Sequence, residues 1–156
     1  MTTGIATRED LLSRSGLDFM RAMLAGDLPP PPMAETMNFT ATVVEDGRVI
    51  FTGSATGAHL NPMGGVHGGW FGAILDSCMA CAVMTKVPKG SVYTTLDYHL
   101  NLTGALKPGM EVTATGTVEH TGRTTAVARG EIRGQDGRLY ATGSTTCLIM
   151  TVAGDA

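Results

Sequence analysis

A single carboxylate interrupts an otherwise apolar segment: Asp76 lies between Trp70 and Val83. This segment contains no proline and no other charged residue. Its composition favours a helix, and a helix that is apolar nearly all round is buried. A carboxylate there is costly unless another group pairs with it. The residues one turn away cannot do so, because they are Gly72, Ala73, Met79 and Ala80. Asp76 is therefore either a structural acid, bonded to a strand hydroxyl or a backbone N–H, or a general base.

A glycine-rich segment leads into this helix and reads Asn61-Pro-Met-Gly-Gly-Val-His-Gly-Gly. The first turn of a helix carries unpaired N–H groups and a partial positive charge. Gly68 and Gly69 would place these donors where no side chain obstructs a carbonyl oxygen. Donors of this kind stabilise the oxyanion that forms in acyl transfer. The segment therefore predicts an oxyanion site beside His67.

Helix geometry separates the two candidate groups. A rise of 1.5 Å per residue places Asp76 roughly 12 Å from Gly68. One acyl group bound along one helix can hardly contact both Asp76 and Gly68. Either the curvature of the sheet bends the substrate so that it reaches both residues, or Asp76 works with Gly68 of a second copy of the chain.

Hydrophobic periodicity predicts the elements that position these residues. We expect an amphipathic helix over Thr7–Leu24, an extended proline-rich crossing over Asp27–Met33 and a long helix from His67 to about Lys86. The expected strands are Phe39–Val43, Val49–Thr56, Tyr93–Leu102, Glu111–His120, Thr124–Arg133 and Arg138–Thr151. On the long strand, strict alternation puts Val92, Thr94, Leu96, Tyr98, Leu100 and Leu102 on one face.

These elements predict an α+β fold, a curved antiparallel sheet wrapped around one long central helix, with an N-terminal helix. The helix from His67 is the only element apolar enough to cover the sheet. It cannot shield both edges, so we expect an edge strand to pair with a second subunit. At 156 residues the chain is expected to form a single domain, residues 1–156, in which residues 1–33 supply the N-terminal helix and the proline-rich crossing.

Composition excludes several classes of partner. Charged residues make up 16% of the chain, against about 25% in an average soluble domain. The formal net charge is −3 and there is no basic run, so neither nucleic acid nor a membrane is an expected partner. Three cysteines, an odd number, favour reduced thiols and a cytoplasmic protein. The start of the chain lacks the layout of a signal peptide.

The order of these elements, and the run from Asn61 to Gly69 followed by Leu75-Asp76, resembles the hotdog-fold acyl-CoA thioesterases, in particular the PaaI-like branch. The likeness extends to Gly26-Asp-Leu-Pro, Tyr93-Thr-Thr-Leu, Lys107-Pro-Gly and Thr146-Cys-Leu-Ile. The resemblance implies hydrolysis of an acyl- or aryl-CoA thioester without a metal or other cofactor, CoA being part of the substrate. It also implies a homodimer with shared sites, commonly paired into a homotetramer.

The resemblance also implies roles for particular residues. Asp76 would be the general base or nucleophile, and the Gly68 N–H would polarise the thioester carbonyl. Asn61 would lie near the attacking group, and Thr95 would position water, with Thr94 one register away. Since family sites are shared between subunits, we favour the arrangement in which Asp76 works with Gly68 of a second copy.

Ordinary structural roles remain open for several of these residues. His67 either takes part in the chemistry or orients its loop; Asn61 is otherwise a turn residue before Pro62. Arg123 is either a solvated turn charge or a contact for the CoA phosphates. Cys78 and Cys81 form a C-x-x-C pair without a second pair, which indicates core packing rather than zinc or redox chemistry.

Two other functions remain as alternatives. A hydratase or dehydratase on this fold would need a His–acid pair at one carbon, but His67 and Asp76 lie far apart along one helix. A non-catalytic acyl-CoA-binding module would keep the cleft and lose the acid, yet the acid is present.

Overall fold

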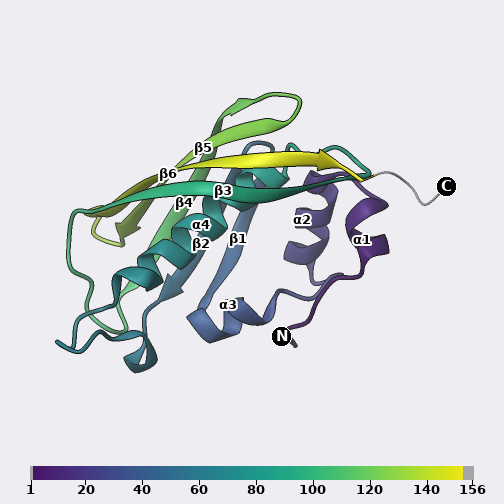
Figure 1. The fold of residues 1–156 in the computed structure, drawn as a ribbon. Helices are drawn as coiled ribbons and strands as arrows, with labels where there is room; N and C mark the ends of the chain where they lie inside the picture. Colours follow the sequence, from purple (N-terminus) through teal and green to yellow (C-terminus); the bar gives the residue numbers. More distant parts are fainter. Residues whose placement is uncertain (1, 153–156) are drawn as a thin grey trace.

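The computed structural model describes residues 2–152 and consists of a curved antiparallel sheet that holds one long helix on its concave side (Figure 1). Three short helices lie at the N-terminal end. The elements are α1 (Arg8–Leu12), α2 (Gly16–Ala25), α3 (Pro32–Met37), β1 (Phe39–Glu45), β2 (Arg48–Ser54), the 3₁₀ turn η1 (Gly57–His59), α4 (Gly68–Met84), β3 (Ser91–Leu102), β4 (Glu111–Thr121), β5 (Thr125–Gly134) and β6 (Leu139–Thr151).

The six strands lie in the order β1-β2-β4-β5-β6-β3. All neighbouring pairs are antiparallel. The fully buried side chains come mainly from α4 and from the strand faces turned toward it: Trp70, Ile74, Leu75, Cys78, Met79, Val83, Val49, Val112, Ile132 and Cys147. The predicted α+β arrangement, with a curved sheet around one central helix, is confirmed.

Two glycines allow backbone to approach α4 closely. A Cβ on Gly116 of β4 would overlap the Cys78 carbonyl oxygen. A Cβ on Gly16 of α2 would overlap the Met84 carbonyl oxygen. The helix is therefore held against β4 at its middle and against α2 at its C-terminal end.

The N-terminal region differs from the prediction in two places. The single helix expected over Thr7–Leu24 is two helices, because Ser15 caps α2 by accepting from the Asp18 N–H, at 3.2 Å. The expected extended crossing ends early, since α3 begins at Pro32, where a proline at the first helical position costs no hydrogen bond. Asp27 and Leu28 bend back toward α2, where their N–H groups donate to the Ala22 carbonyl oxygen, and Pro31 is extended.

Strand β3 differs from the prediction more consequentially. It pairs with β6 and forms an edge of the sheet, three places away from β4, the strand that follows it in the chain. The register with β6 shifts between Thr95 and Asp97, which leaves a β-bulge at Leu96. The strict alternation predicted for this strand is therefore wrong. Tyr93 and Thr95 face α4 before the bulge, and Tyr98 and Leu100 face it afterwards.

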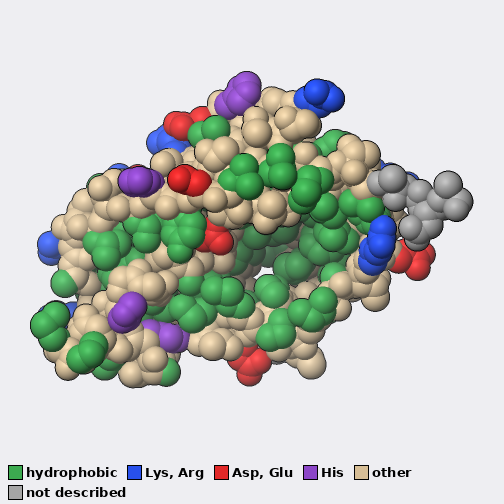
Figure 2. Space-filling view, in the orientation of Figure 1, with side chains coloured by type: hydrophobic (Ala, Val, Ile, Leu, Met, Phe, Trp, Pro, Cys, Tyr) green, Lys and Arg blue, Asp and Glu red, His purple; other side chains and the backbone are tan. Residues whose placement is uncertain are grey.

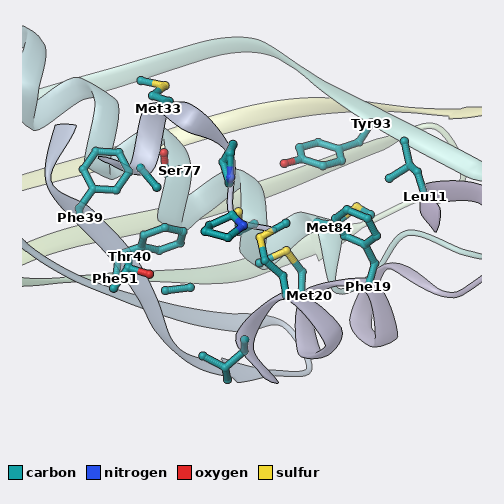
Figure 3. Close-up of a pocket in the computed structure, with 17 residues that line it drawn as sticks. Leu11, Phe19, Met20, Met33, Phe39, Thr40, Phe51, Ser77, Met84 and Tyr93 are labelled. Atoms are coloured by element: carbon teal, nitrogen blue, oxygen red, sulfur yellow. The ribbon is translucent and has the colours of Figure 1, made fainter. Parts of the chain in front are cut away.

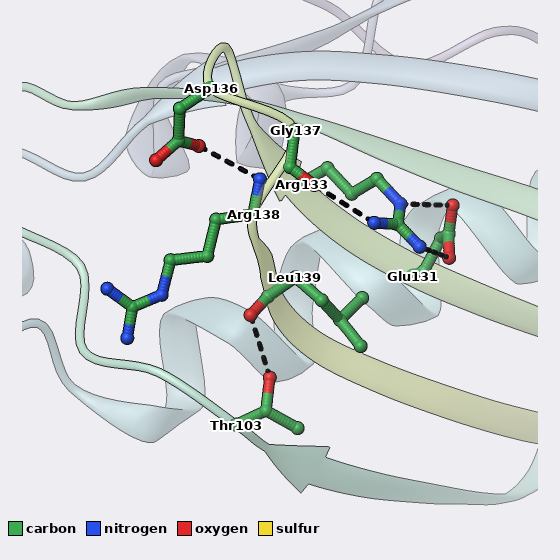
Figure 4. A network of polar contacts seen from close by, with 7 residues as sticks. All are labelled: Thr103, Glu131, Arg133, Asp136, Gly137, Arg138 and Leu139. Atoms are coloured by element: carbon green, nitrogen blue, oxygen red, sulfur yellow. Dashed lines mark hydrogen bonds and ion pairs between the residues drawn. The ribbon is translucent and has the colours of Figure 1, made fainter.

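The end of the sheet near the β5–β6 turn is fixed by polar contacts (Figure 4). Arg133 donates to both carboxylate oxygens of Glu131, at 2.8 and 3.0 Å, and to the Gly137 carbonyl oxygen at 3.0 Å. The Thr103 hydroxyl donates to the Leu139 carbonyl oxygen at 2.9 Å. The Thr103 bond connects the start of β6 to the chain that leaves β3, so the far end of β3 is held in place.

Candidate active site

Asp76 lies on the side of α4 that faces the edge strand β3. The Thr95 hydroxyl donates to Asp76 Oδ1 at 3.0 Å. Within residues 2–152 no donor is found for Oδ2, and the residue is half-buried rather than enclosed. Leu96, the bulged residue, comes directly after Thr95. The bulge allows Thr95 to face α4 although Tyr98 and Leu100, at odd separations from it, face α4 as well. The carboxylate is thus held by one oxygen, and the other is free to accept a proton.

The N-terminus of α4 offers one free donor. His67 is the N-cap: its Nδ1 accepts from the Gly69 N–H at 2.9 Å, and its carbonyl oxygen accepts from the Trp70 N–H at 3.0 Å. No acceptor for the Gly68 N–H lies in the described part of the chain. Since Nδ1 accepts a hydrogen bond, the proton of the neutral ring is on Nε2. His67 thus orients the first turn of α4 in this structure, and its part in the chemistry stays a prediction. The Gly69 N–H already has an acceptor.

Asn61 organises the loop before α4. Its Oδ1 accepts from the Met63 N–H at 2.9 Å and from the Gly65 N–H at 3.1 Å. The side-chain amide nitrogen has no acceptor among the described residues. Asn61 therefore acts as a turn residue in this structure, and its side-chain N–H groups remain available to donate to a substrate or a water molecule.

His59, which the sequence did not single out for this purpose, braces the same loop. Its Nδ1 accepts from the Thr56 N–H at 2.9 Å, and its Nε2 lies 2.8 Å from the Thr36 carbonyl oxygen, to which it donates. Its own carbonyl oxygen accepts from the His67 N–H at 2.8 Å. The acceptor Thr36 lies 23 residues away in the chain, so no local pattern could have shown this contact.

The candidate residues do not all meet. Along the strip of α4 that faces β3, Gly68 lies against Leu102, Gly72 against Leu100 and Tyr98, and Asp76 against Thr95. Two turns of helix, roughly 12 Å, separate Asp76 from the Gly68 N–H within one chain. The structure therefore brings together Asp76 with Thr95, and His67 with Gly69, as two separate groups.

Thr94 and Arg123 lie away from both groups. Thr94 is exposed, next to Thr95, whose side chain faces α4. Arg123 is exposed in the turn between β4 and β5 and makes no ion pair within residues 2–152. Substrate contacts by these residues, and by Gly69, stay predictions.

With this geometry in hand, known proteins provide a comparison. The family model of the thioesterase superfamily matches residues 63–141, about half of the chain. A phenylacetic acid degradation-related protein from Ralstonia eutropha JMP134 is 33% identical, with a TM-score of 0.76 over 83% of this chain and 98% of that one. The chain belongs to the thioesterase superfamily.

Two further solved structures are similar. A mutant of the phenylacetic acid degradation protein PaaI from Thermus thermophilus is 26% identical, with a TM-score of 0.69 over 75% of this chain and 97% of that one. A hypothetical thioesterase from Streptococcus pneumoniae TIGR4, solved with coenzyme A, is 27% identical, with a TM-score of 0.67 over 75% and 89%. No curated protein matches. The predicted hotdog fold and PaaI-like branch are confirmed.

The thiols of this superfamily member are poorly suited to nucleophilic chemistry. Burial raises the pKa of the Cys81 thiol to about 12 and raises the pKa of the Cys78 thiol further. Both groups are therefore protonated at neutral pH, and a thiol is a weak nucleophile. Within residues 2–152 no three His, Cys, Asp or Glu side chains gather where they could hold a metal ion.

A cavity lies beside Ser77, the residue after Asp76, and its position and size were not predicted from the sequence. It measures about 420 Å³ and is bounded by the N-terminal helices, β1, β3 and α4 (Figure 3). In Figure 2 it corresponds to a hollow lined by hydrophobic side chains. Its lining consists of Leu11, Phe19, Met20, Met23, Leu24, Pro30, Pro31, Met33, Ala34, Phe39, Thr40, Ala41, Phe51, Ser77, Cys81, Met84 and Tyr93. Helical spacing in α2 indicated a buried face but could not show that the space facing it is empty.

Proposed function

We propose that this protein is an acyl-CoA thioesterase, which hydrolyses a CoA thioester to a free acid and CoA. The observation that carries the proposal is the half-exposed Asp76 carboxylate, which Thr95 holds by one oxygen only. Membership of the thioesterase superfamily supports it, as does the coenzyme A found with the pneumococcal protein of similar structure.

The reaction needs an activated water and a group that stabilises negative charge on the thioester oxygen. In the base mechanism, Asp76 takes a proton from water while the water oxygen attacks the carbonyl carbon. The carbonyl oxygen gains negative charge and accepts from the Gly68 N–H. The C–S bond then breaks, the thiolate leaves as CoA and takes up a proton. In the nucleophilic alternative, Asp76 attacks first and water cleaves the resulting anhydride.

A second copy of the chain supplies Gly68 in this proposal, because the carboxylate and the free N–H lie too far apart along one helix. Strand β3 offers a place for the copy. It is a 12-residue edge strand on which Leu96, Tyr98 and Leu102 are 58%, 47% and 50% exposed. Unpaired edges of this length favour pairing with another chain. We further propose that the dimers pair into a homotetramer.

A cytoplasmic location completes the proposal. The three cysteines form no disulfide, which fits a reducing compartment. Over residues 2–152 none of the helices has the length and hydropathy needed to cross a bilayer.

Thiol release tests the activity. The wild-type protein is incubated with a panel of acyl- and aryl-CoA thioesters, and free thiol is followed beside Asp76→Asn. We expect release by the wild type and a loss of about 10²-fold or more in the variant, equivalent to about 2.7 kcal/mol. Binding without turnover would show that the protein is a non-catalytic binding module. Addition of water to an enoyl-CoA without thiol release would show that it is a hydratase.

The shared site has its own test, because Gly68 is the first residue of α4. Proline is well tolerated at that position and removes the N–H, and the extended backbone of His67 suits a following proline. Gly68→Pro should therefore lose thiol release while keeping its fold. Gly68→Ala retains the N–H and should keep both its fold and its thiol release.

Mixed dimers then decide whether the site is shared. Subunits of Asp76→Asn and Gly68→Pro are unfolded together and refolded. If each site takes Asp76 from one chain and Gly68 from the other, one of the two sites in every mixed dimer is intact, so roughly a quarter of wild-type activity returns. If both residues act within one chain, none returns.

A further inference from the structure

The cavity described above lies next to the proposed catalytic acid. Ser77, which follows Asp76 in α4, lines it, as does Cys81 one turn further along. Tyr93 lines it from β3, two residues before Thr95 and on the same face. Asp76 and Thr95 do not line the cavity themselves, but Ser77 and Tyr93, one and two residues away from them, do. The cavity therefore adjoins the pair Asp76–Thr95 and extends toward the N-terminal helices.

The chemistry of the lining is almost entirely apolar. Of the 17 lining residues, the three that carry a hydroxyl are Thr40, Ser77 and Tyr93, and none is Asp, Glu, Lys, Arg or His. A charged group placed there would lose its hydration without gaining a partner. A space of about 420 Å³ lies within the range of small-molecule sites. An apolar cavity is a poor site for water and a good one for hydrocarbon.

We propose that this cavity binds the acyl group of the substrate, that the group is an unbranched saturated chain of medium length, and that α2 and α3 set the longest chain accepted. The proposal rests on the proposed function for the identity of the thioester. Met20, Met23, Met33 and Met84 supply much of the wall (Figure 3). Methionine side chains adapt their shape, which suits a flexible chain better than a rigid, substituted ring.

The N-terminal helices supply one wall of the cavity. Met20 is buried, and Met23 and Ala34 are half-buried in this wall. The Trp70 indole N–H donates to the Met37 carbonyl oxygen at 2.8 Å, and the Gly16 N–H donates to the Val87 carbonyl oxygen at 2.9 Å. The wall is therefore fixed to both ends of α4, and a longer side chain on it shortens the cavity.

Calorimetry tests the proposal with a series of saturated acyl-CoAs of two to twelve carbons. The protein used is Asp76→Asn, because this variant is expected not to hydrolyse them. Each methylene that enters the cavity should tighten Kd about fourfold, until the cavity is full. Adding Ala34→Leu or Ala41→Leu should weaken the longest chains about tenfold or more and leave acetyl-CoA unchanged. Ala25→Leu is the matched control, because Ala25 is an exposed alanine of α2 outside the lining.

The outcomes separate this inference from the proposed function. A Kd that does not depend on chain length, or equal weakening of all chains by Ala34→Leu and Ala41→Leu, overturns the acyl site even if the wild type releases thiol. If Kd falls with chain length, and if Ala34→Leu and Ala41→Leu lower the longest chain length that still binds tightly, the acyl site is supported even when the wild type releases no thiol. Tighter binding of a dicarboxylic acyl-CoA than of the saturated ester of equal length would also overturn it.

Discussion

The two long sides of α4 differ in how closely the sheet approaches them. On the side of β4 and β5 there is no room: a Cβ on Gly116 would overlap the Cys78 carbonyl oxygen, and one on Gly130 would lie 2.7 Å from Met79. On the side of β3, added Cβ atoms on Gly68 and Gly72 would meet nothing nearer than 3.4 Å. The half-buried Asp76 lies on this looser side.

This difference indicates a division of labour within one helix. The tight side fixes the position of α4 through backbone contact, so its residues govern stability. The looser side keeps a carboxylate, a free N–H and an adjoining cavity accessible, so its residues govern chemistry. Substitutions on the two sides should therefore change different measurements.

The largest expected effect on stability is at Gly116. Gly116→Ala should lower the free energy of unfolding by about 3 kcal/mol, because a backbone oxygen must move to admit the methyl group. Denaturant unfolding measures the change. Gly57→Ala is the control, since no atom lies within 4 Å of its added Cβ. Equal stability of the two variants would contradict the close contact.

On the looser side, Thr95→Val should lower kcat/KM about tenfold and leave the thermal midpoint nearly unchanged, because it removes the donor that holds Asp76 Oδ1. Thr95→Ser keeps the hydroxyl and should recover most of the rate. A rate for Thr95→Val equal to that of the wild type would show that the bond does not position the carboxylate.

At the N-terminus of α4, His67→Ala should cost about 1 kcal/mol of stability, because the Gly69 N–H loses its acceptor. Asparagine is a good N-cap, so His67→Asn should restore stability. The pair also separates the two roles considered for His67. If thiol release falls sharply in His67→Asn while stability is normal, the ring takes part in the chemistry.

The smallest effect is expected at Cys81. With a pKa of about 12, this thiol should react with iodoacetamide about 10³-fold more slowly than an ordinary thiol near neutral pH. Because Cys81 also lines the cavity, the comparison uses acetyl-CoA, for which Cys81→Ala should change kcat/KM by less than about twofold. Rapid alkylation at neutral pH with loss of activity would contradict a passive role.

The pH dependence of stability follows from the same raised pKa. Above the pKa of the unfolded thiol, near 8.5, the unfolded chain binds fewer protons than the folded one. Stability should therefore fall as pH rises from about 8.5 toward 12. Unfolding of Cys81→Ala across this range should show a shallower fall than the wild type.

Sequence alone predicted much of this fold because its signals are local. The long helix shows in the apolar run around Asp76, and the hairpins show in alternation and turn residues. The order of the strands is not local. Placing β3 beside β6 depends on pairing between segments about 50 residues apart, from Leu102↔Ala141 to Ser91↔Thr151. The bulge at Leu96 depends on the same pairing, so alternation assigned half of the strand to the wrong face.

The candidate site was predictable to a similar extent. The position of Asp76 in an apolar helix indicated that it needed a partner, and a strand hydroxyl was one of the partners considered. The place and size of the cavity were out of reach, because an empty space depends on how side chains from α2, β1 and α4 fail to meet. His59 was out of reach too, since its acceptor Thr36 lies 23 residues away in the chain.

The bulge in β3 has a consequence for how this chain tolerates insertion and deletion. Thr95 and Tyr98 lie three positions apart, so an unbroken ladder would turn them to opposite faces, and the extra residue Leu96 is what lets both face the helix. Deleting Leu96 would leave them two positions apart, on the same face of a regular strand. This point of β3 should therefore tolerate the loss of one residue better than the rest of the strand, where a deletion exchanges the inner and outer faces.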